Sequence, residues 1–235
     1  MKAVILAGGR GTRLHPVTIE TPKPLLTVKK KPIINYLIEM FRQHNIRSIK
    51  IIIRDTDRED FAWWMERYKG ALLGMEISFG VEQESMGTMG YLYHELSEWI
   101  GTEDICVTNG DELKQIDLRA MEALHKKIKS SATIALVKVN NPKDYGVAIC
   151  KGNSIVNFLE KPDHPPSNYI SSGLYMMSPI KAFAHIEKKD RFLMLEKDLF
   201  PLLAKHKSLA GYKSNSPWYD CGTLERWEQA IKQWA

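Results

Sequence analysis

The chain has 235 residues, of which 44% are hydrophobic and 26% charged, and 33 Lys and Arg against 28 Asp and Glu give a formal net charge of +5. This apolar content excludes a disordered chain and is sufficient for a large core. No apolar run approaches the ~18 residues of a membrane span. The apolar start, Met1 to Ala7, is too short for a signal peptide.

The positive charge is modest and spread along the chain, which is typical of a soluble protein. No dense Lys/Arg tract or RNA-binding signature occurs, so neither nucleic acid nor a membrane is expected as a partner. The three cysteines, Cys106, Cys150 and Cys221, are far apart and lack the spacing of metal ligands. They predict reduced thiols in a cytoplasmic protein.

The first half of the chain alternates short apolar runs with amphipathic segments. We predict strands over Lys2 to Leu6, Ile49 to Ile53, Met75 to Val81 and Asp104 to Thr108, and helices over Pro32 to His44, Asp57 to Lys69, Thr88 to Leu96 and Asp117 to Lys129. This alternation predicts an α/β fold with a mostly parallel, Rossmann-like sheet flanked by helices. Ligands of such sheets bind at the carboxyl ends of the strands.

The second half of the chain is rich in predicted strands. They cover Ala132 to Val139, Tyr145 to Cys150, Ile155 to Leu159 and Tyr169 to Met177, with turns rich in Asn, Gly and Pro between them. Helices follow over Met194 to His206 and Leu224 to Trp234. We therefore expect an antiparallel or mixed β-rich insertion on the first sheet and no linker between independent domains.

A glycine-rich turn follows the first strand, Leu6-Ala7-Gly8-Gly9-Arg10-Gly11-Thr12-Arg13-Leu14, with Thr21-Pro22-Lys23-Pro24 after it. Backbone N–H groups in such a turn favour anionic oxygens. Arg13 adds a bidentate phosphate donor and Lys23 a point charge. The dinucleotide pattern GxGxxG fails at Leu14, which disfavours a nicotinamide-dependent oxidoreductase, and the P-loop GK[ST] is absent. A plain glycine turn is the alternative to a phosphate site.

Together with Pro22-Lys23-Pro24, the stretch from Leu6 to Leu14 resembles the signature of the sugar-1-phosphate nucleotidyltransferases. Six further matches follow in the family's order: Met86-Gly87-Thr88, Asn109-Gly110-Asp111, Tyr145-Gly146-Val147, Glu160-Lys161-Pro162, Ser172-Gly173-Leu174-Tyr175, and Trp218 to Thr223. The resemblance implies the nucleotide-diphospho-sugar transferase fold as a single domain over 1–235. Residues 1–130 would mainly bind the nucleotide, and residues 131–235 would supply the sugar-phosphate-binding insertion and the closing helices.

The resemblance implies attack by a sugar-1-phosphate oxygen on the α-phosphorus of a nucleoside triphosphate, with release of pyrophosphate. Positioning and charge stabilisation carry such a reaction, and the phosphate nucleophile is already ionised, so no general base is needed. Arg13, Lys23 and Asp111 would be the catalytic residues. Asp111 and Asp220 would hold Mg²⁺, which prefers oxygen ligands. A turn-capping role is the alternative for Asp111.

The resemblance also implies two sets of binding residues. The nucleotide would be bound by Leu6, Ala7, Gly8, Gly9, Gly11, Thr12, Arg13, Lys23, Glu82, Gly87, Thr88 and Asp111. The sugar 1-phosphate would be bound by Asn109, Tyr145, Gly146, Glu160, Lys161, Ser171, Ser172 and Gly173. Glu160 would accept hydrogen bonds from sugar hydroxyls, and Lys161 would meet the phosphate. Ser171 stands where the family commonly has Asn, which leaves the identity of the sugar open.

Glu82 aligns with the family's base-reading position, five residues before Gly87. A carboxylate only accepts hydrogen bonds, which suits the two adjacent donors of guanine, so GTP is favoured and CTP is second. A shift of one residue would place Gln83 there and reopen UTP or dTTP. Alternatively, Glu82 faces solvent and backbone groups read the base.

The resemblance extends to short bacterial enzymes for mannose, heptose and N-acetylmuramate 1-phosphates. We therefore expect a catalytic unit without the C-terminal β-helix of longer relatives, acting in surface polysaccharide or glycan precursor synthesis. A homodimer is compatible with this reading. The non-enzymatic alternative, a silent regulatory or binding subunit, would be expected to lose Arg13, Lys23, Asp111 or Asp220, and all four residues are present.

Overall fold

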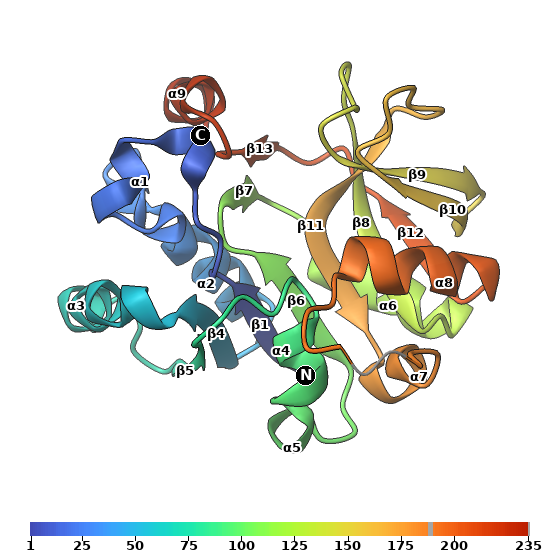
Figure 1. Ribbon diagram of the computed structural model, residues 1–235, viewed down its shortest axis with the longest axis horizontal. Helices are drawn as coiled ribbons and strands as arrows, with labels where there is room; N and C mark the ends of the chain where they lie inside the picture. Colours follow the sequence, from blue (N-terminus) through green and yellow to red (C-terminus); the bar gives the residue numbers. More distant parts are fainter. Residues whose placement is uncertain (188–189, 235) are drawn as a thin grey trace. The chain divides into compact units, whose positions relative to one another are not determined.

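The computed structural model describes residues 1–187 and 190–234, which form two compact units built from separate stretches of the chain (Figure 1). Unit 1 comprises Met1–Lys2, Met86–Val107 and Ile116–Ser216. Unit 2 comprises Ala3–Ser85, Thr108–Gln115 and Pro217–Ala235. The sequence analysis assigned nucleotide binding mainly to residues 1–130 and sugar-phosphate binding mainly to residues 131–235, and this assignment stays a prediction.

Unit 2 contains three parallel strands in the order β5-β4-β1, namely β5 (Glu76–Glu82), β4 (Ser48–Arg54) and β1 (Lys2–Leu6). Ala3 pairs with Ile49, and Ser48 pairs with Glu76. The amphipathic helices α2 (Ile33–Gln43) and α3 (Arg58–Tyr68) bury their apolar sides, including Leu37. The predicted parallel α/β pattern is confirmed, with element ends that move by one or two residues.

Shorter elements complete unit 2 around the ends of these strands. They are the 3₁₀ turns η1 (Thr12–Leu14), η2 (Lys23–Leu25) and η3 (Asp55–Asp57), helix α1 (Val17–Glu20), the hairpin of β2 (Thr27–Val28) and β3 (Lys31–Pro32), and the antiparallel pair of β7 (Glu112–Lys114) and β13 (Trp218–Asp220). The last helix, α9 (Leu224–Gln233), packs through Ala230 into a core that includes Leu14, Leu113 and Cys221. This packing fixes the late β13 segment beside β7.

Unit 1 carries a mixed sheet in the order β11-β8-β12-β10-β9, in which β9 also pairs with β11. The strands are β8 (Ala132–Lys138), β9 (Gly146–Lys151), β10 (Ser154–Glu160), β11 (Tyr169–Met177) and β12 (Leu209–Lys213). Only β12 runs parallel to its neighbour β8, and the other pairings are antiparallel. The predicted β-rich insertion is confirmed, although β12 was not predicted. Strand β6 (Ile105–Asn109) leads from unit 1 into unit 2.

Two helices cover the two faces of the unit 1 sheet (Figure 1). Helix α6 (Leu118–Ile128) places His125 against Thr133. Helix α8 (Phe200–Lys205) places Phe200 against Phe158 and Tyr175. Because Tyr175 pairs with Ile134, the neighbour of Thr133, and side chains alternate along a strand, these contacts lie on opposite faces.

The remaining helices of unit 1 are short: α4 (Gly90–His94), α5 (Ser97–Ile100) and α7 (Pro179–Phe183). The helix predicted over Thr88 to Leu96 is wrong at its start, because residues 87–89 form a turn and the N–H of Met89 donates to the Leu193 carbonyl. The helix predicted from Met194 begins as a π-helical turn, η4 (Leu195–Leu199), before α8. Pro201 has no N–H for an i→i−4 hydrogen bond, which accounts for the irregular start.

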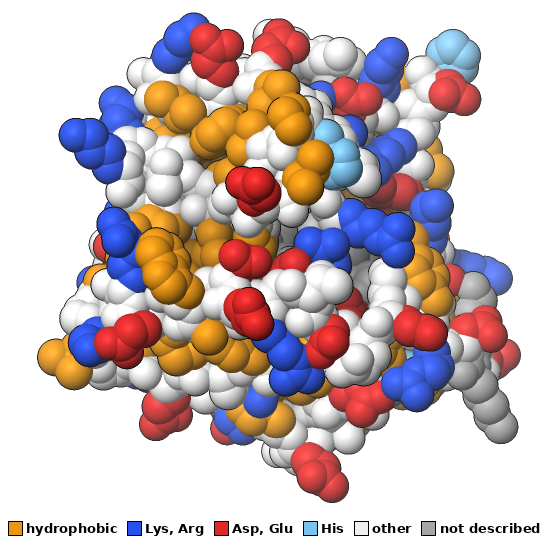
Figure 2. Space-filling view, turned by 60° about the vertical axis from the view of Figure 1, so that its left-hand side comes forward, with side chains coloured by type: hydrophobic (Ala, Val, Ile, Leu, Met, Phe, Trp, Pro, Cys, Tyr) orange, Lys and Arg blue, Asp and Glu red, His pale blue; other side chains and the backbone are white. Residues whose placement is uncertain are grey.

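Among residues 1–187 and 190–234, no helix has the length and hydropathy needed to cross a bilayer. Acidic and basic side chains are interspersed on the face shown in Figure 2.

Candidate functional site

The loop after β1 contains two closely packed glycines, Gly8 and Gly11. Gly11 has φ +67°, and a Cβ there would lie 3.0 Å from Thr18 and 3.1 Å from Lys23. Thr18 closes the loop by donating a 2.7 Å hydrogen bond to the Gly11 carbonyl. A Cβ on Gly8 would lie 2.7 Å from Oε2 of Glu82. The loop therefore packs directly against two other parts of unit 2.

A cleft of about 850 Å³ lies beside this loop within unit 2. It is lined by Gly8, Gly9, Arg10, Thr12, His15, Thr18, Ile19, Arg54, Asp55, Thr56, Glu82, Gln83, Glu84 and Ser85. The cleft is large enough for a nucleotide-sized ligand. It lies at the carboxyl ends of β1, β4 and β5, where ligands of parallel sheets bind.

Glu82 is buried in this cleft wall, with 7% of its surface exposed, which excludes the alternative that it faces solvent. It ends β5 and pairs in register with Arg54, the last residue of β4. Arg54 is held by two hydrogen bonds to Asp57, of 2.9 and 2.7 Å. Gln83, the competing base reader, is exposed and donates to Asp55. Sequence reasoning missed Arg54, which no motif marked.

Lys23 and Asp111 form an ion pair of 2.7 Å between Nζ and Oδ2. Burial acts to raise the pKa of Asp111, but Lys23, assisted by Lys114, holds that pKa below its usual value. Asp111 is therefore ionised at neutral pH, as a metal ligand must be. The pair joins the segment after the glycine loop to the end of β6.

Asp220 lies beside Asp111, because the backbone N–H of Cys221 donates to the Asp111 carbonyl at 3.1 Å. Its carboxylate accepts hydrogen bonds of 2.7 Å from Gly222 N and from Arg226. Arg13 belongs to the same cluster, since one of its guanidinium nitrogens lies 3.1 Å from the position that a Cβ on Gly222 would occupy. Burial and the surrounding acids raise the pKa of Cys221, which keeps this thiol protonated.

Glu112, which the motifs did not mark, is buried next to these acids. Burial and the charges of Asp111 and Asp220 raise the pKa of Glu112 to about 7, although Lys114 opposes the shift. In the described part of the chain, no three His, Cys, Asp or Glu side chains form a metal-binding group. Two carboxylates, Asp111 and Asp220, remain the predicted ligand set.

The predicted sugar residues of β9 and β10 lie in unit 1. Gly146 pairs with Glu160, and a Cβ on Gly146 would lie 2.4 Å from Phe158 and 3.1 Å from Oε2 of Glu160. The Glu160 carboxylate therefore lies over a glycine. Lys161 is more than half exposed, with Nζ 3.5 Å from Glu160, and its N–H donates to the Tyr145 carbonyl.

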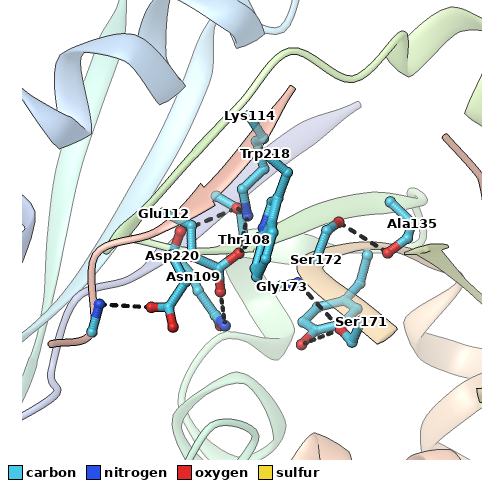
Figure 3. A network of polar contacts seen from close by, with 12 residues as sticks. Thr108, Asn109, Glu112, Lys114, Ala135, Ser171, Ser172, Gly173, Trp218 and Asp220 are labelled. Carbon is cyan, nitrogen blue, oxygen red and sulfur yellow. Dashed lines mark hydrogen bonds and ion pairs between the residues drawn. The ribbon is translucent and has the colours of Figure 1, made fainter. Parts of the chain in front are cut away.

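The Ser-Ser-Gly segment of β11 is buried. Ser172 donates to the Ala135 carbonyl at 2.9 Å, and Ser171 donates to the Tyr175 hydroxyl at 3.3 Å (Figure 3). The N–H of Gly173 donates back to the Ser171 hydroxyl. These bonds occupy both serine hydroxyls inside unit 1. Their contacts with a sugar stay predictions.

Gly87 and Thr88, predicted to bind the nucleotide, lie in unit 1. Gly87 has φ +74°, and a Cβ there would lie 2.3 Å from the Leu193 carbonyl oxygen. Thr88 donates to Glu196 at 2.6 Å and accepts from the N–H of Leu195 at 2.9 Å. Burial raises the pKa of Glu196, a residue that sequence reasoning missed. Glu196 stands next to the charged residues Lys197 and Asp198, so no local sequence pattern set it apart.

The residues that were predicted to form the functional site are divided between the two units. Unit 2 contains Leu6, Ala7, Gly8, Gly9, Gly11, Thr12, Arg13, Lys23, Glu82, Asn109, Asp111 and Asp220, and unit 1 contains Gly87, Thr88, Tyr145, Gly146, Glu160, Lys161, Ser171, Ser172 and Gly173. The structure thus brings the predicted phosphate and metal residues together in one unit.

This geometry defines an α/β protein suited to holding phosphate groups. A family model described as nucleotidyl transferase matches residues 2–235, so the chain belongs to the nucleotidyl transferase family.

Individual relatives give the comparison more detail. The chain is 34% identical over 228 residues to a mannose-1-phosphate guanyltransferase of Debaryomyces hansenii, covering 94% of this chain and 61% of that protein. It is 30% identical over 226 residues to a mannose-1-phosphate guanylyltransferase of Mycobacterium tuberculosis, covering 95% of this chain and 61% of that protein. The chain therefore spans about three fifths of the length of these relatives.

Solved structures show the same fold. A structure from Bacillus anthracis that is described as a glucose-1-phosphate thymidylyltransferase superposes with a TM-score of 0.87 at 26% identity, covering 99% of this chain and 94% of that one. HddC from Yersinia pseudotuberculosis, solved with GMP-PN, superposes with a TM-score of 0.79 at 23% identity, covering 100% and 99%. The nucleotide-diphospho-sugar transferase fold is thus confirmed.

Proposed function

We propose that this protein transfers a nucleotidyl group from a nucleoside triphosphate to a sugar 1-phosphate, giving a nucleoside-diphosphate sugar and pyrophosphate. The reaction is an in-line attack on the α-phosphorus. The observation that carries the proposal is the cluster in unit 2 of the glycine loop, the Lys23–Asp111 pair and Asp220. Membership of the nucleotidyl transferase family and the activities for which the relatives are named support it.

Arg13 and Lys23 are the phosphate-binding cations of this mechanism. Arg13 is exposed on η1 and offers a planar fork that matches phosphate oxygens. Lys23 is buried beside the loop and brings a fixed positive charge. Both stabilise the charge that develops on the triphosphate as pyrophosphate leaves. The sugar phosphate is already ionised, so the chain needs no general base.

Asp111 and Asp220 are the residues that would hold Mg²⁺. Mg²⁺ binds through one or two carboxylates and completes its shell with water and substrate phosphates, so carboxylates on two segments joined by a backbone hydrogen bond suit this ion. When bound, the ion supplies positive charge to the phosphate oxygens. Lys23 and Arg226, which now pair with these carboxylates, hold them in place.

GTP is the favoured nucleotide because Glu82 is a buried acceptor in the cleft wall. Guanine presents two adjacent donors to such a carboxylate. The guanyltransferase names of the similar proteins agree with this choice. Cytidylyl, uridylyl or thymidylyl transfer is the alternative within the same reaction class.

The residues of unit 1 that were predicted to bind the sugar 1-phosphate keep that role in this proposal. Glu160 is placed over Gly146, where its carboxylate can accept from sugar hydroxyls. The exposed Lys161 meets the phosphate. Mannose 1-phosphate is the first sugar to test, since the similar proteins carry its name.

We place the product in surface polysaccharide or glycan precursor synthesis in the cytoplasm, and a homodimer is the assembly to test.

The test is release of pyrophosphate from each common nucleoside triphosphate with Mg²⁺ and a panel of sugar 1-phosphates. We expect release with GTP and mannose or heptose 1-phosphate. A folded protein that releases none with any pair would refute the proposal and favour a silent binding subunit.

A further inference from the structure

The buried carboxylate of Glu112 holds three hydrogen-bond donors (Figure 3). Its Oε1 accepts from Nδ2 of Asn109 at 2.9 Å, and its Oε2 accepts from Nε1 of Trp218 at 2.7 Å and from Nζ of Lys114 at 3.1 Å. Lys114 is fully buried and also donates to Thr108 at 3.1 Å. Replacing such a buried ion pair by well-packed apolar residues is often neutral or stabilising, so stability alone does not explain the pair.

The Glu112 side chain fixes which way the Asn109 amide points. Nδ2 of Asn109 donates to Oε1 of Glu112, so the amide carbonyl oxygen of Asn109 faces the other way. Asn109 ends β6 two residues before Asp111, and it is a proposed sugar-phosphate residue. Glu112 thus sets whether this side chain offers an acceptor or a donor to a ligand.

Glu112 also ties together the two short strands β7 and β13, which lie beside Asp111 and carry Asp220. In the β7–β13 pair, Trp218 lies opposite Lys114, and Asp220 lies opposite Glu112. The indole hydrogen bond holds the Trp218 ring two residues before Asp220. Lys114 neutralises the charge of Glu112 inside the unit. One carboxylate therefore reaches both segments around the proposed reaction centre.

We propose that Glu112, paired with Lys114, is a positioning residue that orients the Asn109 amide so that its carbonyl oxygen accepts a hydrogen bond from a sugar hydroxyl. This inference rests on the proposed function, because it names the way in which the same sugar 1-phosphate is recognised. A merely structural pair would hold β7 against β13 and leave sugar recognition unchanged.

The primary test is Glu112→Gln, assayed for pyrophosphate release. The amide has one acceptor oxygen in place of two, so it cannot receive both Asn109 and Trp218 in the present arrangement. We expect the KM for the sugar 1-phosphate to rise about tenfold, the scale of one lost polar interaction, with the KM for the nucleoside triphosphate changed less than about twofold. An unchanged sugar KM would overturn the proposal.

The double variant Glu112→Gln/Lys114→Met covers the case in which Glu112→Gln alone unfolds. It removes the unpaired buried ammonium that the single change leaves behind. The same rise in sugar KM is expected. Glu122→Gln is the matched control, since its pair with Lys126 lies on the surface of α6. Its sugar KM should equal that of the wild type.

A double-mutant cycle with Asn109→Ala distinguishes an effect of Glu112 that acts through Asn109 from a general effect of the substitution on the fold. If Glu112 acts through Asn109, adding Glu112→Gln to Asn109→Ala leaves the sugar KM of the single Asn109→Ala variant unchanged. Fully additive effects would contradict the proposal. Wild-type protein that releases no pyrophosphate with any pair would refute the proposed function instead, so the two failures are distinct.

The Trp218 indole gives a readout that does not depend on activity. Its N–H resonance, assigned among the six tryptophans with Trp218→Phe, should exchange slowly with solvent in the wild type and shift in Glu112→Gln. A resonance that does not move would show that Glu112 does not hold this ring, against the proposal.

Discussion

Lys23 donates a 2.7 Å hydrogen bond to Asp111 across 88 residues of sequence. The bond links the proposed phosphate-binding cation to the proposed metal ligand inside one compact unit. Asp220 joins the same cluster through the backbone bond from Cys221 to Asp111. Opposite charges are thus arranged before any ligand arrives, which reduces the cost of ordering them during the reaction.

Asp111→Asn should abolish most activity while leaving the fold intact. The amide keeps the shape of the carboxylate but removes the charge that binds Mg²⁺, so we expect turnover to fall by about 100-fold or more. Pyrophosphate release and Mg²⁺ titration measure the effect. Glu59→Gln, an exposed acid of α3, is the control. Near-normal turnover of Asp111→Asn would remove this residue from the metal site.

Glu82→Gln should shift the base preference away from guanine. The amide pairs one donor with one acceptor, which matches the ring imide of uracil or thymine. We expect kcat/KM for GTP to fall about tenfold relative to UTP or dTTP, the scale of one mismatched hydrogen bond. The ratio of kcat/KM across the nucleoside triphosphates is the measurement. An unchanged ratio would show that Glu82 does not read the base.

Hydrophobic periodicity in the sequence was sufficient to predict the long helices and strands but not the short ones. The buried strands and amphipathic helices such as α2 and α6 follow the predicted ranges within a few residues. Strands β7 and β13 have three residues each, too few to show an alternation. Strand β12 contains Gly211, and a glycine weakens the sequence pattern by which a strand is predicted. A Cβ at this position would lie 2.6 Å from Leu136.

The site was predictable where a motif marked it. Gly8 and Asp111 follow strands and Lys23 follows the glycine loop, all in recognisable patterns, and the structure brings Lys23 and Asp111 together. Glu112 and Lys114 were not predictable, because charged residues in a short segment indicate a solvated surface. Their burial depends on the pairing of β7 with β13, which are about 100 residues apart in the chain. Such contacts carry no local signal.

His125 should make the protein less stable in mild acid. Burial lowers the pKa of His125, although Asp104 opposes the shift, and the charges of Lys181, Glu122 and Lys126 contribute less to it. Below the unfolded pKa of about 6.5, the unfolded chain binds a proton that the native ring resists. Stability from this group is therefore complete above that pH and is lost as pH falls toward the native pKa.

The measurement for His125 is the unfolding midpoint of His125→Gln between pH 7.5 and 5.5. The wild type should lose more stability over this range than the variant, which has no proton to bind. His164→Gln, at an exposed position, is the control and should keep the wild-type slope. Equal slopes for all three proteins would show that His125 titrates alike in both states.

Gly87→Ala should destabilise unit 1 for two reasons that a matched variant separates. Gly87 has φ +74°, a conformation that costs a non-glycine residue about 1 kcal/mol, and its new Cβ would lie 2.3 Å from the Leu193 carbonyl. Gly152 has φ +61° with nothing within 4 Å, so Gly152→Ala reports the backbone cost alone. We expect Gly87→Ala to lower the free energy of unfolding by at least about 2 kcal/mol more than Gly152→Ala, measured by urea denaturation. Equal losses would mean that the Leu193 segment moves aside freely, and that residues 86–89 are not held against it as the structure shows.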